Sequence, residues 1–498
     1  MTLSTKRNRT SPGDDGHRIN CVTIFNKICQ GVQYCTELRT SNPENGAIFD
    51  LGSKNQISEH GSKRVFRMLG DHLKLIVLML SAVCIFALPA YAQAPQEETL
   101  AGPDAHEAAE AAHGHLFGDW GGARTRLLKR GVKLDLHYLS DSLWNVASQQ
   151  KERFASYDRV RGTVDVDLGK LVNLEGLSFH ATAVWQAGGN LGAYLGLIAN
   201  PSGIANTNTF RLDSWWIEKR WLNGRVAARL GQFAGQDTYG DQDYGKSFVF
   251  VPLADNLDNL FTTIESFDPP STPAMEISVA PLRHVYVKSM VLAGDRAPFS
   301  HNPTGLVPQF RGTPVSVSEV GFTPGKKASA VHGPENVESR KGYSGLYQFG
   351  AAYNPGNFTM PASATTRSGN YLLYWMASQS LWRVDPKEAK GLDGTFAYDW
   401  SPANVNRNNT TLSAGLRFNE PLPLHIHNTM ALGYVQNSLS PQFLPSSAPA
   451  WKTERGTEFN ALFLVGPLLL QPVIQYYADA GGGSQRAVVL GFRTKVEF

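Results

Sequence analysis

His106, Glu110 and His113 are spaced so that a helix would present all three on one face. Imidazole and carboxylate groups in such a row can hold a transition metal, and the pattern superficially resembles the HExxH motif of zinc enzymes. Position 110 is Glu where that motif has its second His, however. The surrounding stretch 101–115 is rich in Ala and Glu. We therefore expect a short solvated helix there rather than a metal site.

A second group, Asp237, Asp241 and Asp243, has carboxylates close enough in sequence to bind calcium. It lies at the start of the segment 239–311, which is rich in Pro, Asp and Gly and alternates only weakly. We favour a solvated loop over a calcium site here. The sequence also has no GxSxG motif and no convincing Ser/His/Asp arrangement, so we expect neither an enzyme nor a bound cofactor.

The stretch 210–232 is the best-defined hairpin of the chain. Asn223-Gly224 forms its turn, because a two-residue hairpin turn needs positive φ at both positions. Charged and aromatic side chains share one face of its two strands: Trp216, Glu218, Arg220, Arg225 and Arg229. An aromatic ring beside donors and acceptors suits the rings and hydroxyls of sugars. The alternative is an ordinary charged strand face.

Short alternating runs fill the chain from Leu116 onward. Apolar and polar residues alternate at 132–138, 163–168, 177–186 and 411–418. Because a strand places successive side chains on opposite faces, and no helical stretches intervene, the pattern predicts an all-β protein. The polar faces of these runs add further candidates for a binding site: Asp165, Asp167 and Arg417.

The C-terminal stretch 484–498 indicates what kind of β-protein this is. Val488, Leu490 and Phe492 fall on one face, and Arg493 and Lys495 fall on the other. In an outer-membrane barrel this would be the closing strand, with its apolar face towards lipid and its charged face towards the lumen. Aromatic residues at strand ends match the interfacial girdles of such barrels: Tyr138, Trp185, Trp221, Trp382, Trp400, Tyr476, Tyr477 and Phe498.

The expected barrel is wide. About 380 residues follow Leu116, and each strand with its share of turn and loop takes roughly 20–25, so we predict a transmembrane antiparallel β-barrel of about 16 strands with a short N-terminal periplasmic helix. A barrel of this width leaves an aqueous channel rather than a filled core.

The N-terminal part has the pattern of a secretory leader. The apolar run 75–88 follows Lys63, Arg64, Arg67 and Lys74 and leads to a small-residue site ending at Ala92. This order is that of a signal peptide, which we expect to span 68–92. We expect 1–67 to be a gene-model extension or disordered leader, with translation starting at Met68. We expect 93–116 to be a periplasmic segment and 117–498 to be the barrel. All 4 Cys lie within 1–92, so the mature chain needs no disulfide framework.

The basic excess of the full chain lies in the N-terminal residues 1–92. Residues 1–92 carry 11 Lys+Arg and 7 Asp+Glu of the 46 and 43 in the chain, which leaves the remainder with a net charge near −1. The mature chain therefore has no basic excess that would indicate nucleic-acid binding. A mean hydropathy of -0.24 and a single long apolar run argue against a helical membrane protein.

From Phe117 onward the chain resembles the OprB family of carbohydrate-selective porins. The residues that carry the resemblance occur in order along the chain: Gly118-Asp119-Trp120-Gly121-Gly122, Arg124 and Arg126; Arg211, Trp216, Glu218, Gly224, Arg225, Gly231 and Gln232; Ser368-Gly369-Asn370-Tyr371, Gln379 and Arg383; Leu470-Gln471-Pro472, Gln475-Tyr476 and Gly481-Gly482. The chain departs from the family in its extended N-terminus and in Ala478-Asp479-Ala480, where the family usually has Pro before its Gly pair.

This resemblance implies passive diffusion of glucose and related mono- and oligosaccharides through a charged and aromatic-lined lumen. It also implies a homotrimer embedded in lipid, in the outer membrane of a Gram-negative bacterium. Facilitated passage needs weak binding, and facing donors and acceptors suit a neutral polyol. The main alternative is a porin for other small solutes, such as organic anions or amino acids. An outer-membrane enzyme and a soluble secreted β-protein are further alternatives.

Overall fold

The computed structural model describes residues 114–205, 208–235, 238–240, 247–254, 271–325, 343–360, 365–386, 388–424, 426–443 and 452–498. These residues belong to one compact unit, 100–498. The candidate metal groups, His106, Glu110 and His113 together with Asp237, Asp241 and Asp243, lie outside the described residues, as does the leader 1–92. Among the residues described, no helix is both long enough and apolar enough to cross a membrane.

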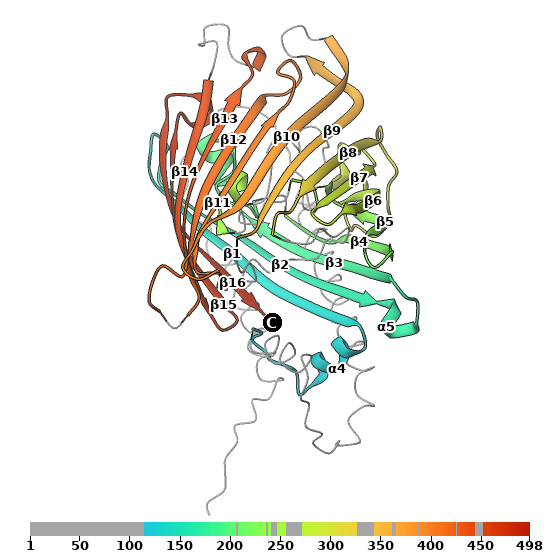
Figure 1. Ribbon diagram of the computed structural model, residues 1–498. Helices are drawn as coiled ribbons and strands as arrows, with labels where there is room; N and C mark the ends of the chain where they lie inside the picture. The colour runs from blue at the N-terminus through green and yellow to red at the C-terminus, as the bar shows by residue number, and fades with distance from the viewer. Residues whose placement is uncertain are drawn as a thin grey trace, which may run out of the picture. The chain divides into compact units, whose positions relative to one another are not determined.

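In the described part of the chain, 16 antiparallel strands form one closed barrel. Each strand pairs with its neighbours in sequence, and β16 pairs with β1 to close the ring (Figure 1). The strands are β1 Val132–Ser148, β2 Arg153–Asp167, β3 Leu177–Gly188, β4 Thr209–Trp221, β5 Val226–Phe233, β6 Thr272–Leu282, β7 Val285–Leu292, β8 Val315–Phe322, β9 Gly345–Met360, β10 Thr365–Arg383, β11 Gly391–Trp400, β12 Asn408–Asn419, β13 Asn428–Leu439, β14 Lys452–Val465, β15 Leu468–Ala478 and β16 Arg486–Glu497. The predicted all-β barrel is confirmed.

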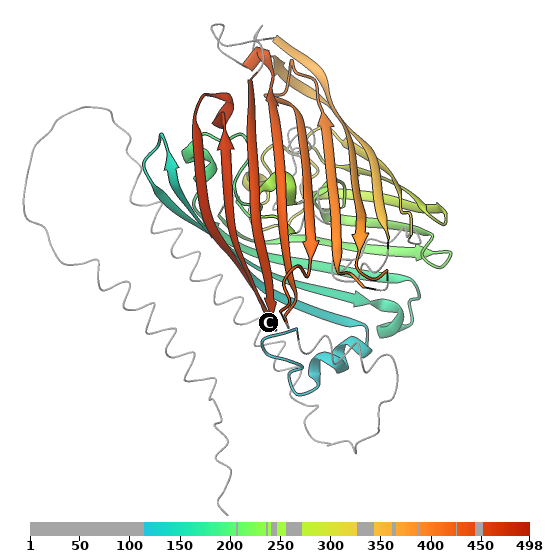
Figure 2. The ribbon, with the colours of Figure 1, turned by 60° about the vertical axis from the view of Figure 1, so that its left-hand side comes forward.

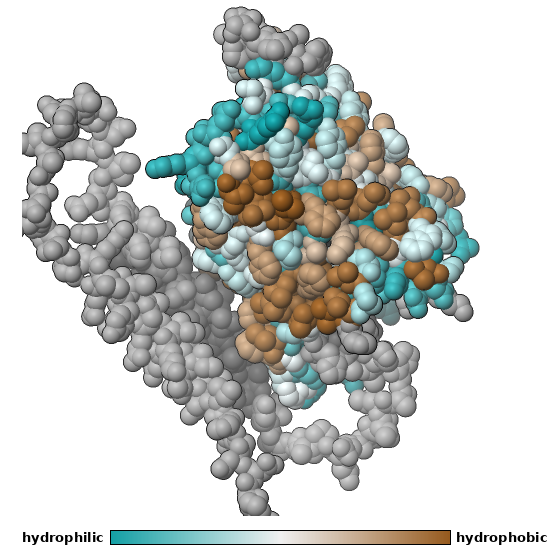
Figure 3. Space-filling view, turned by 90° about the vertical axis from the view of Figure 1, so that its left-hand side faces the viewer, coloured by the Kyte–Doolittle hydropathy of each residue, from teal (hydrophilic) through white to brown (hydrophobic). Residues whose placement is uncertain are grey.

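Charged side chains face the inside of the barrel and apolar side chains face the outside. Asp141, Lys288 and Glu458 are at most 1% exposed, whereas Phe154 and Leu230 are 61% and 66% exposed. Figure 3 shows apolar side chains gathered across the middle and lower part of one face. A soluble protein has the opposite distribution, so the outside of this barrel is built to meet lipid.

The two ends of the barrel differ in the length of their connections. The start of β1 and the end of β16 lie at the same end, and several connections there are short: 222–225, 283–284 and 466–467. The connection 323–344 is a longer one at this end. At the opposite end, the longest connections are 234–271, 293–314 and 189–208. Short periplasmic turns and long extracellular loops are typical of such barrels, so the start of β1 and the end of β16 mark the periplasmic end.

Short helices occupy several connections rather than the barrel wall. The described helices are α4 Ala123–Lys129 before β1, α5 Leu168–Val172 after β2, α6 Leu191–Leu195 after β3, α7 Val251–Ala254 before β6, α9 Pro298–His301 after β7, and the 3-10 turns η5 Pro441–Phe443 and η6 Ala480–Gly482. The start of α4 is held by Asp119, whose Oδ1 accepts hydrogen bonds of 2.8 Å from the backbone N–H and the hydroxyl of Thr125.

The periplasmic segment 114–130 docks on the closing strand. Arg124 Nη2 donates to the backbone oxygen of Phe498 at 2.5 Å, and the rings of Phe117 and Phe498 lie 5.5 Å apart. The N–H of Leu116 donates to the carbonyl of Glu497 at 2.7 Å. Burial, with the charge of Arg124 beside it, lowers the pKa of His115. The segment therefore ties the N-terminal side of the barrel to the C-terminal residue.

Two expectations about this architecture were wrong. Much of the weakly alternating segment 239–311 belongs to the wall, because β6 and β7 lie within it. Side-chain burial alternates along both strands. In the sequence, however, 285–292 is mostly apolar on both faces, and Pro and Gly flank both strands. Tyr477 is also not part of an outer girdle. It is fully buried and packs edge-on against Phe250, with ring centroids 5.3 Å apart.

Candidate functional site

The lumen is narrowed by two segments that fold into it from the extracellular end. The first, residues 191–205, begins with α6 and is attached to β14 and β15. Glu454 accepts hydrogen bonds from the backbone N–H groups of Ile198 and Ala199, at 2.8 and 3.1 Å. Gln475 donates to the carbonyl of Pro201 at 2.8 Å. These bonds give the backbone of the segment the partners that it would otherwise find in water.

The second inward segment, residues 247–254, contains α7 and is attached to the same wall. Glu458 accepts the N–H of Val249 at 2.9 Å and the N–H of Phe250 at 2.7 Å. The carbonyl of Ser247 accepts hydrogen bonds from the side-chain amides of Asn460 and Gln471, at 2.9 and 2.7 Å. Figure 2 shows this segment, in yellow-green, within the ring of strands. The backbone of this segment therefore forms hydrogen bonds with side chains of the barrel wall, where a strand would bond to the backbone of a neighbouring strand.

Glycines on the lumen face make room for the apolar side chains of this second segment. A Cβ atom at Gly433 would lie 2.3 Å from Cδ1 of Leu253, and one at Gly456 would lie 2.3 Å from Cε1 of Phe250. Real Cβ atoms do not approach other atoms so closely, so a larger residue at either position would push the segment away. The lack of a side chain at Gly433 and Gly456 therefore lets the segment lie against the wall.

The connection that carries the second segment also touches another part of the wall. Gly240 N donates to Glu319 at 3.2 Å, and Lys288 donates to the carbonyl of Thr238. Lys288 and Glu319 are themselves an ion pair of 2.8 Å on β7 and β8. The described ends of this connection are thus held on β7–β8 and on β12–β16, which places them on different sides of the lumen.

Two residues predicted from the sequence, Asp165 and Trp216, form a row with His180 across β2, β3 and β4. Asp165, His180 and Trp216 pair in register. His180 Nδ1 lies 2.6 Å from Asp165 Oδ1, and the imidazole stacks on the indole with ring centroids 3.7 Å apart and planes 12° apart. The side chain of Asp165 is 48% exposed, so its carboxylate is open to water. This row combines an aromatic pair with a solvated acceptor.

A second row continues on β4, β5 and β6. Glu218, Arg229 and Glu276 pair in register. Arg229 Nη2 donates to Glu276 Oε1 at 3.0 Å, and its guanidinium carbon lies 4.9 Å from the ring centroid of Trp216. Arg220 Nε donates to Glu218 Oε1 at 2.5 Å while 41% of the Arg220 side chain stays exposed. Acidic and basic groups therefore alternate across this wall.

We call these residues the β2–β5 strip: Asp165, His180, Trp216, Glu218, Arg220 and Arg229. Five of the six were candidates from the sequence. His180 was not among them, although its place on the polar parity of 177–186 put it on the same face. Glu276, Glu454 and Glu458 also escaped the sequence argument, because their partners lie tens or hundreds of residues away in the chain.

Three other candidates lie elsewhere. Asp167 caps α5, since its Oδ1 accepts the N–H groups of Gly169 and Lys170. Arg225 lies in the exposed turn before β5, where it donates to the carbonyls of Ala280 and Pro281 at 3.4 and 3.1 Å. The expectation that these two residues line the lumen is wrong, because the strands end or begin beside them.

Arg417 does face the lumen, but on β12, away from the strip. Its Nη1 donates to the hydroxyl of Ser247 at 3.2 Å, and its Nε donates to Asn419 at 2.6 Å. Asp393 lies 3.6 Å from Arg417 Nε. These contacts make Arg417 part of the attachment of the second inward segment.

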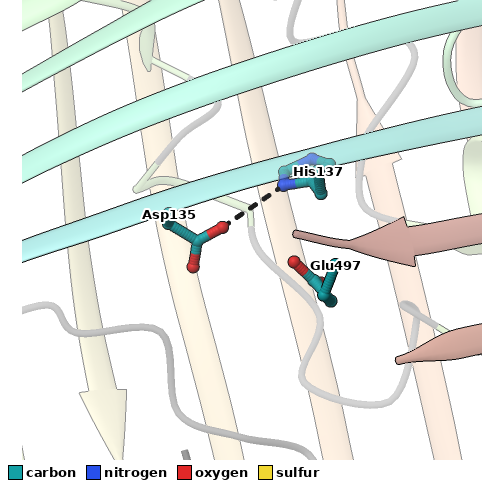
Figure 4. Close-up of side chains that lie close together, drawn as sticks. All are labelled: Asp135, His137 and Glu497. Atoms are coloured by element: carbon teal, nitrogen blue, oxygen red, sulfur yellow. Dashed lines mark ion pairs between the residues drawn. The ribbon is translucent and has the colours of Figure 1, made fainter. Parts of the chain in front are cut away.

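One group of side chains among the described residues has the composition of a metal site. Asp135, His137 and Glu497 offer ligand atoms that all lie within 4.8 Å of one another, where β1 meets β16 (Figure 4). His137 Nδ1 lies 3.6 Å from Asp135 Oδ1, and Lys495 already forms an ion pair with Glu497. The group therefore has a structural explanation as an ionic cluster at the closing seam.

A closed barrel with an apolar outside and a polar, narrowed lumen is a diffusion channel of the outer membrane. Comparison with known protein families gives the same class. Residues 151–498 match the family model described as "Carbohydrate-selective porin, OprB family". The chain belongs to this family, and the resemblance found in the sequence is confirmed. It is an outer-membrane protein of the Gram-negative type that spans the membrane with its strands.

Individual relatives are more distant. The chain is 28% identical to Porin B of Pseudomonas aeruginosa over 132 residues, which cover 24% of this chain and 29% of that protein. The match thus spans less than a third of that relative. The high-pH structure of Pseudomonas putida OprB has a TM-score of 0.68 at 16% identity, and covers 77% of this chain and 98% of its own. The low-pH structure of the same protein has a TM-score of 0.50 at 15% identity, with the same coverage.

Proposed function

We propose that the protein is a passive, carbohydrate-selective pore that admits glucose and related sugars and performs no catalysis. The observation that carries the proposal is the β2–β5 strip, where an aromatic pair lies beside acceptors and donors of both charge signs. A neutral polyol exchanges water for such groups and leaves again, because each hydrogen bond replaces one with water. The alternation of Arg220 and Arg229 with Asp165 and Glu218 favours this solute class over amino acids or organic anions.

Single-channel conductance in a planar bilayer tests this proposal. Glucose and a maltose series added to purified, refolded protein should reduce the current through open channels in a concentration-dependent manner. The control is a sugar-free buffer whose osmolarity is matched with a polymer too large to enter the channel. Open channels that do not respond to any sugar would remove the substrate assignment and leave the barrel intact.

We further propose that the outer face of β1 and β2 is the subunit contact of a homotrimer. Asp158 faces outward in the middle of β2, where its carboxylate accepts hydrogen bonds from Tyr138 at 2.6 Å and from Ser156 at 2.9 Å. A carboxylate facing lipid is unfavourable, and a neighbouring subunit would cover it. Small outward residues close by, such as Gly162, would allow a close approach.

The size of the protein in detergent checks this contact. Gly162→Trp should reduce the trimer to smaller species in analytical ultracentrifugation, because the added ring occupies the contact. Ala414→Trp, on the outer face of β12, is the matched control and should leave the assembly unchanged. Equal sedimentation of both variants and the wild type would show that this face is not the contact.

A further inference from the structure

Two polar side chains on the lumen face of β3 and β4 are buried without partners. Arg211 is 1% exposed, and none of its three guanidinium nitrogens has a hydrogen-bond partner in the described structure. Gln186 is 2% exposed, and neither its amide nitrogen nor its amide oxygen has one. Folded proteins very seldom leave such groups unsatisfied, least of all a charge. The buried donors of both side chains could therefore bind a group that offers hydrogen-bond acceptors.

The two side chains are close enough to act together. Gln186 pairs with Thr209, and Arg211 lies two residues further along the same face of β4. Such diagonal neighbours lie about 7–8 Å apart at their Cα atoms, within reach of two long side chains. Arg159 on β2 pairs directly with Gln186, and Arg161 lies level with Arg211 across Val184. The donors thus sit in a locally basic part of the wall.

The surrounding groups compensate the Arg211 charge only in part. Phe299 places its ring centroid 5.4 Å from the guanidinium carbon, which stabilises a cation through the face of the ring. The ring offers no oxygen or nitrogen acceptor, so the N–H donors of Arg211 stay without a hydrogen-bond partner. Asp213 acts on Arg211 electrostatically, but it makes no hydrogen bond to it.

We propose that Arg211 and Gln186 form a binding site for a small anionic group, either a free anion such as chloride or the carboxylate of an acidic solute. A planar guanidinium offers two parallel N–H donors that match a carboxylate, and the Gln186 amide adds a third donor. A water molecule would accept these hydrogen bonds but would leave the charge in place. An anion does both. The site goes beyond passage of neutral sugars and does not depend on it.

Thermal unfolding of the folded protein in detergent provides the test. Sodium chloride, sodium formate and sodium glucuronate are titrated separately into a low-salt buffer, and the unfolding midpoint is followed by tryptophan fluorescence. A ligand that binds only the folded state raises the midpoint in a saturable manner. We expect the wild type to gain several degrees with at least one of these anions, and Arg211→Gln to lose at least two thirds of that gain.

Two further variants separate the site from general charge effects. Arg225→Gln removes the same charge from the exposed turn and should keep the full gain. Gln186→Leu keeps the charge and removes one donor, so it should weaken the saturation by several-fold without abolishing it. A response to chloride or formate identifies a free ion, whereas a response to glucuronate alone identifies an acidic sugar. If Arg211→Gln and the wild type show equal gains with all three anions, the proposed site does not exist.

Arg211→Met covers the case in which the polar variant folds poorly. With no site, an unpaired buried guanidinium is a pure cost, and this variant would unfold at a higher midpoint than the wild type in every buffer. With the site, its advantage should be confined to the anion-poor buffer and should disappear or reverse at saturating anion. An advantage of constant size across the titration would overturn the proposal.

Discussion

The imidazole of His180 lies flat on the indole of Trp216, with ring centroids 3.7 Å apart. Asp165 holds the imidazole from the neighbouring strand through Nδ1. The indole is thereby fixed on the lumen face between His180 and Arg229, whose guanidinium carbon lies 4.9 Å from its centroid. A ring fixed in this way loses little freedom when a solute binds, which suits weak and rapid exchange.

Replacement of this indole should weaken the interaction with sugar. Aromatic contacts of this kind contribute about 0.5–1.5 kcal/mol, so Trp216→Ala should weaken glucose block of the channel by about 2- to 10-fold. The measurement is the glucose concentration that halves the single-channel current. Trp185→Ala is the control, because Trp185 faces outward with 39% exposure. Equal losses in the two variants would contradict a role for Trp216 in the lumen.

The attachment of residues 247–254 should control the width of the lumen. Glu458→Ala removes the acceptor of two backbone N–H groups, and hydrogen bonds to a charged group contribute about 1.5–3 kcal/mol each. We expect a larger and noisier single-channel conductance and weaker block by glucose, because the segment is then free to leave the wall. Glu388→Ala, in an exposed turn, should behave as the wild type. An unchanged conductance would show that the segment does not limit the current.

A steric change should displace the same segment without removing a charge. In Gly456→Ala the new methyl group would lie 2.3 Å from Cε1 of Phe250. Overpacking of this kind costs about 1–3 kcal/mol, so we expect the variant to unfold at lower urea concentration and to conduct more current. Gly162→Ala is the control, because its Cβ atom would lie 3.6 Å from the nearest atom, Cδ1 of Leu136. A Gly456→Ala variant with normal stability and conductance would contradict the close contact.

The sequence predicts the faces of the strands better than it predicts what the faces contact. The alternation of Val488, Leu490 and Phe492 with Arg493 and Lys495 holds in β16, because the period of a strand is local and one side of this wall meets lipid. Strand ends are harder to locate. Asp167 and Arg225 have the parity of lumen residues, yet the chain turns beside each of them.

Contacts across the lumen are beyond a local pattern. Glu458 has the lumen parity of β14, but its acceptor role depends on Val249 and Phe250, more than 200 positions earlier. Nothing in the residues around 247–254 indicates that a polar wall will hold this apolar segment. Only closure of the barrel brings the glycines of β13 and β14 opposite it. The stack of His180 on Trp216 was missed for a different reason, because it depends on the pairing register of the neighbouring strands β3 and β4.

The buried ion pair of Lys288 and Glu319 should respond very differently to single and double substitution. Both side chains are at most 1% exposed, and Glu319 also accepts hydrogen bonds from Tyr286 and Tyr374, at 2.8 and 2.6 Å. Glu319→Leu leaves the ammonium group of Lys288 without its counter-charge, and loss of one partner of a buried pair costs about 3–5 kcal/mol.

Urea unfolding in lipid vesicles, followed by tryptophan fluorescence, measures this cost as a change in the free energy of unfolding. The double variant Lys288→Met/Glu319→Leu should recover at least half of the loss, because no unpaired charge remains. The exposed pair Arg455 and Asp479 is the matched control, and its corresponding variants should change stability little. If the double variant is less stable than Glu319→Leu alone, the pair stabilises the wall through its attraction, and the argument from burial fails.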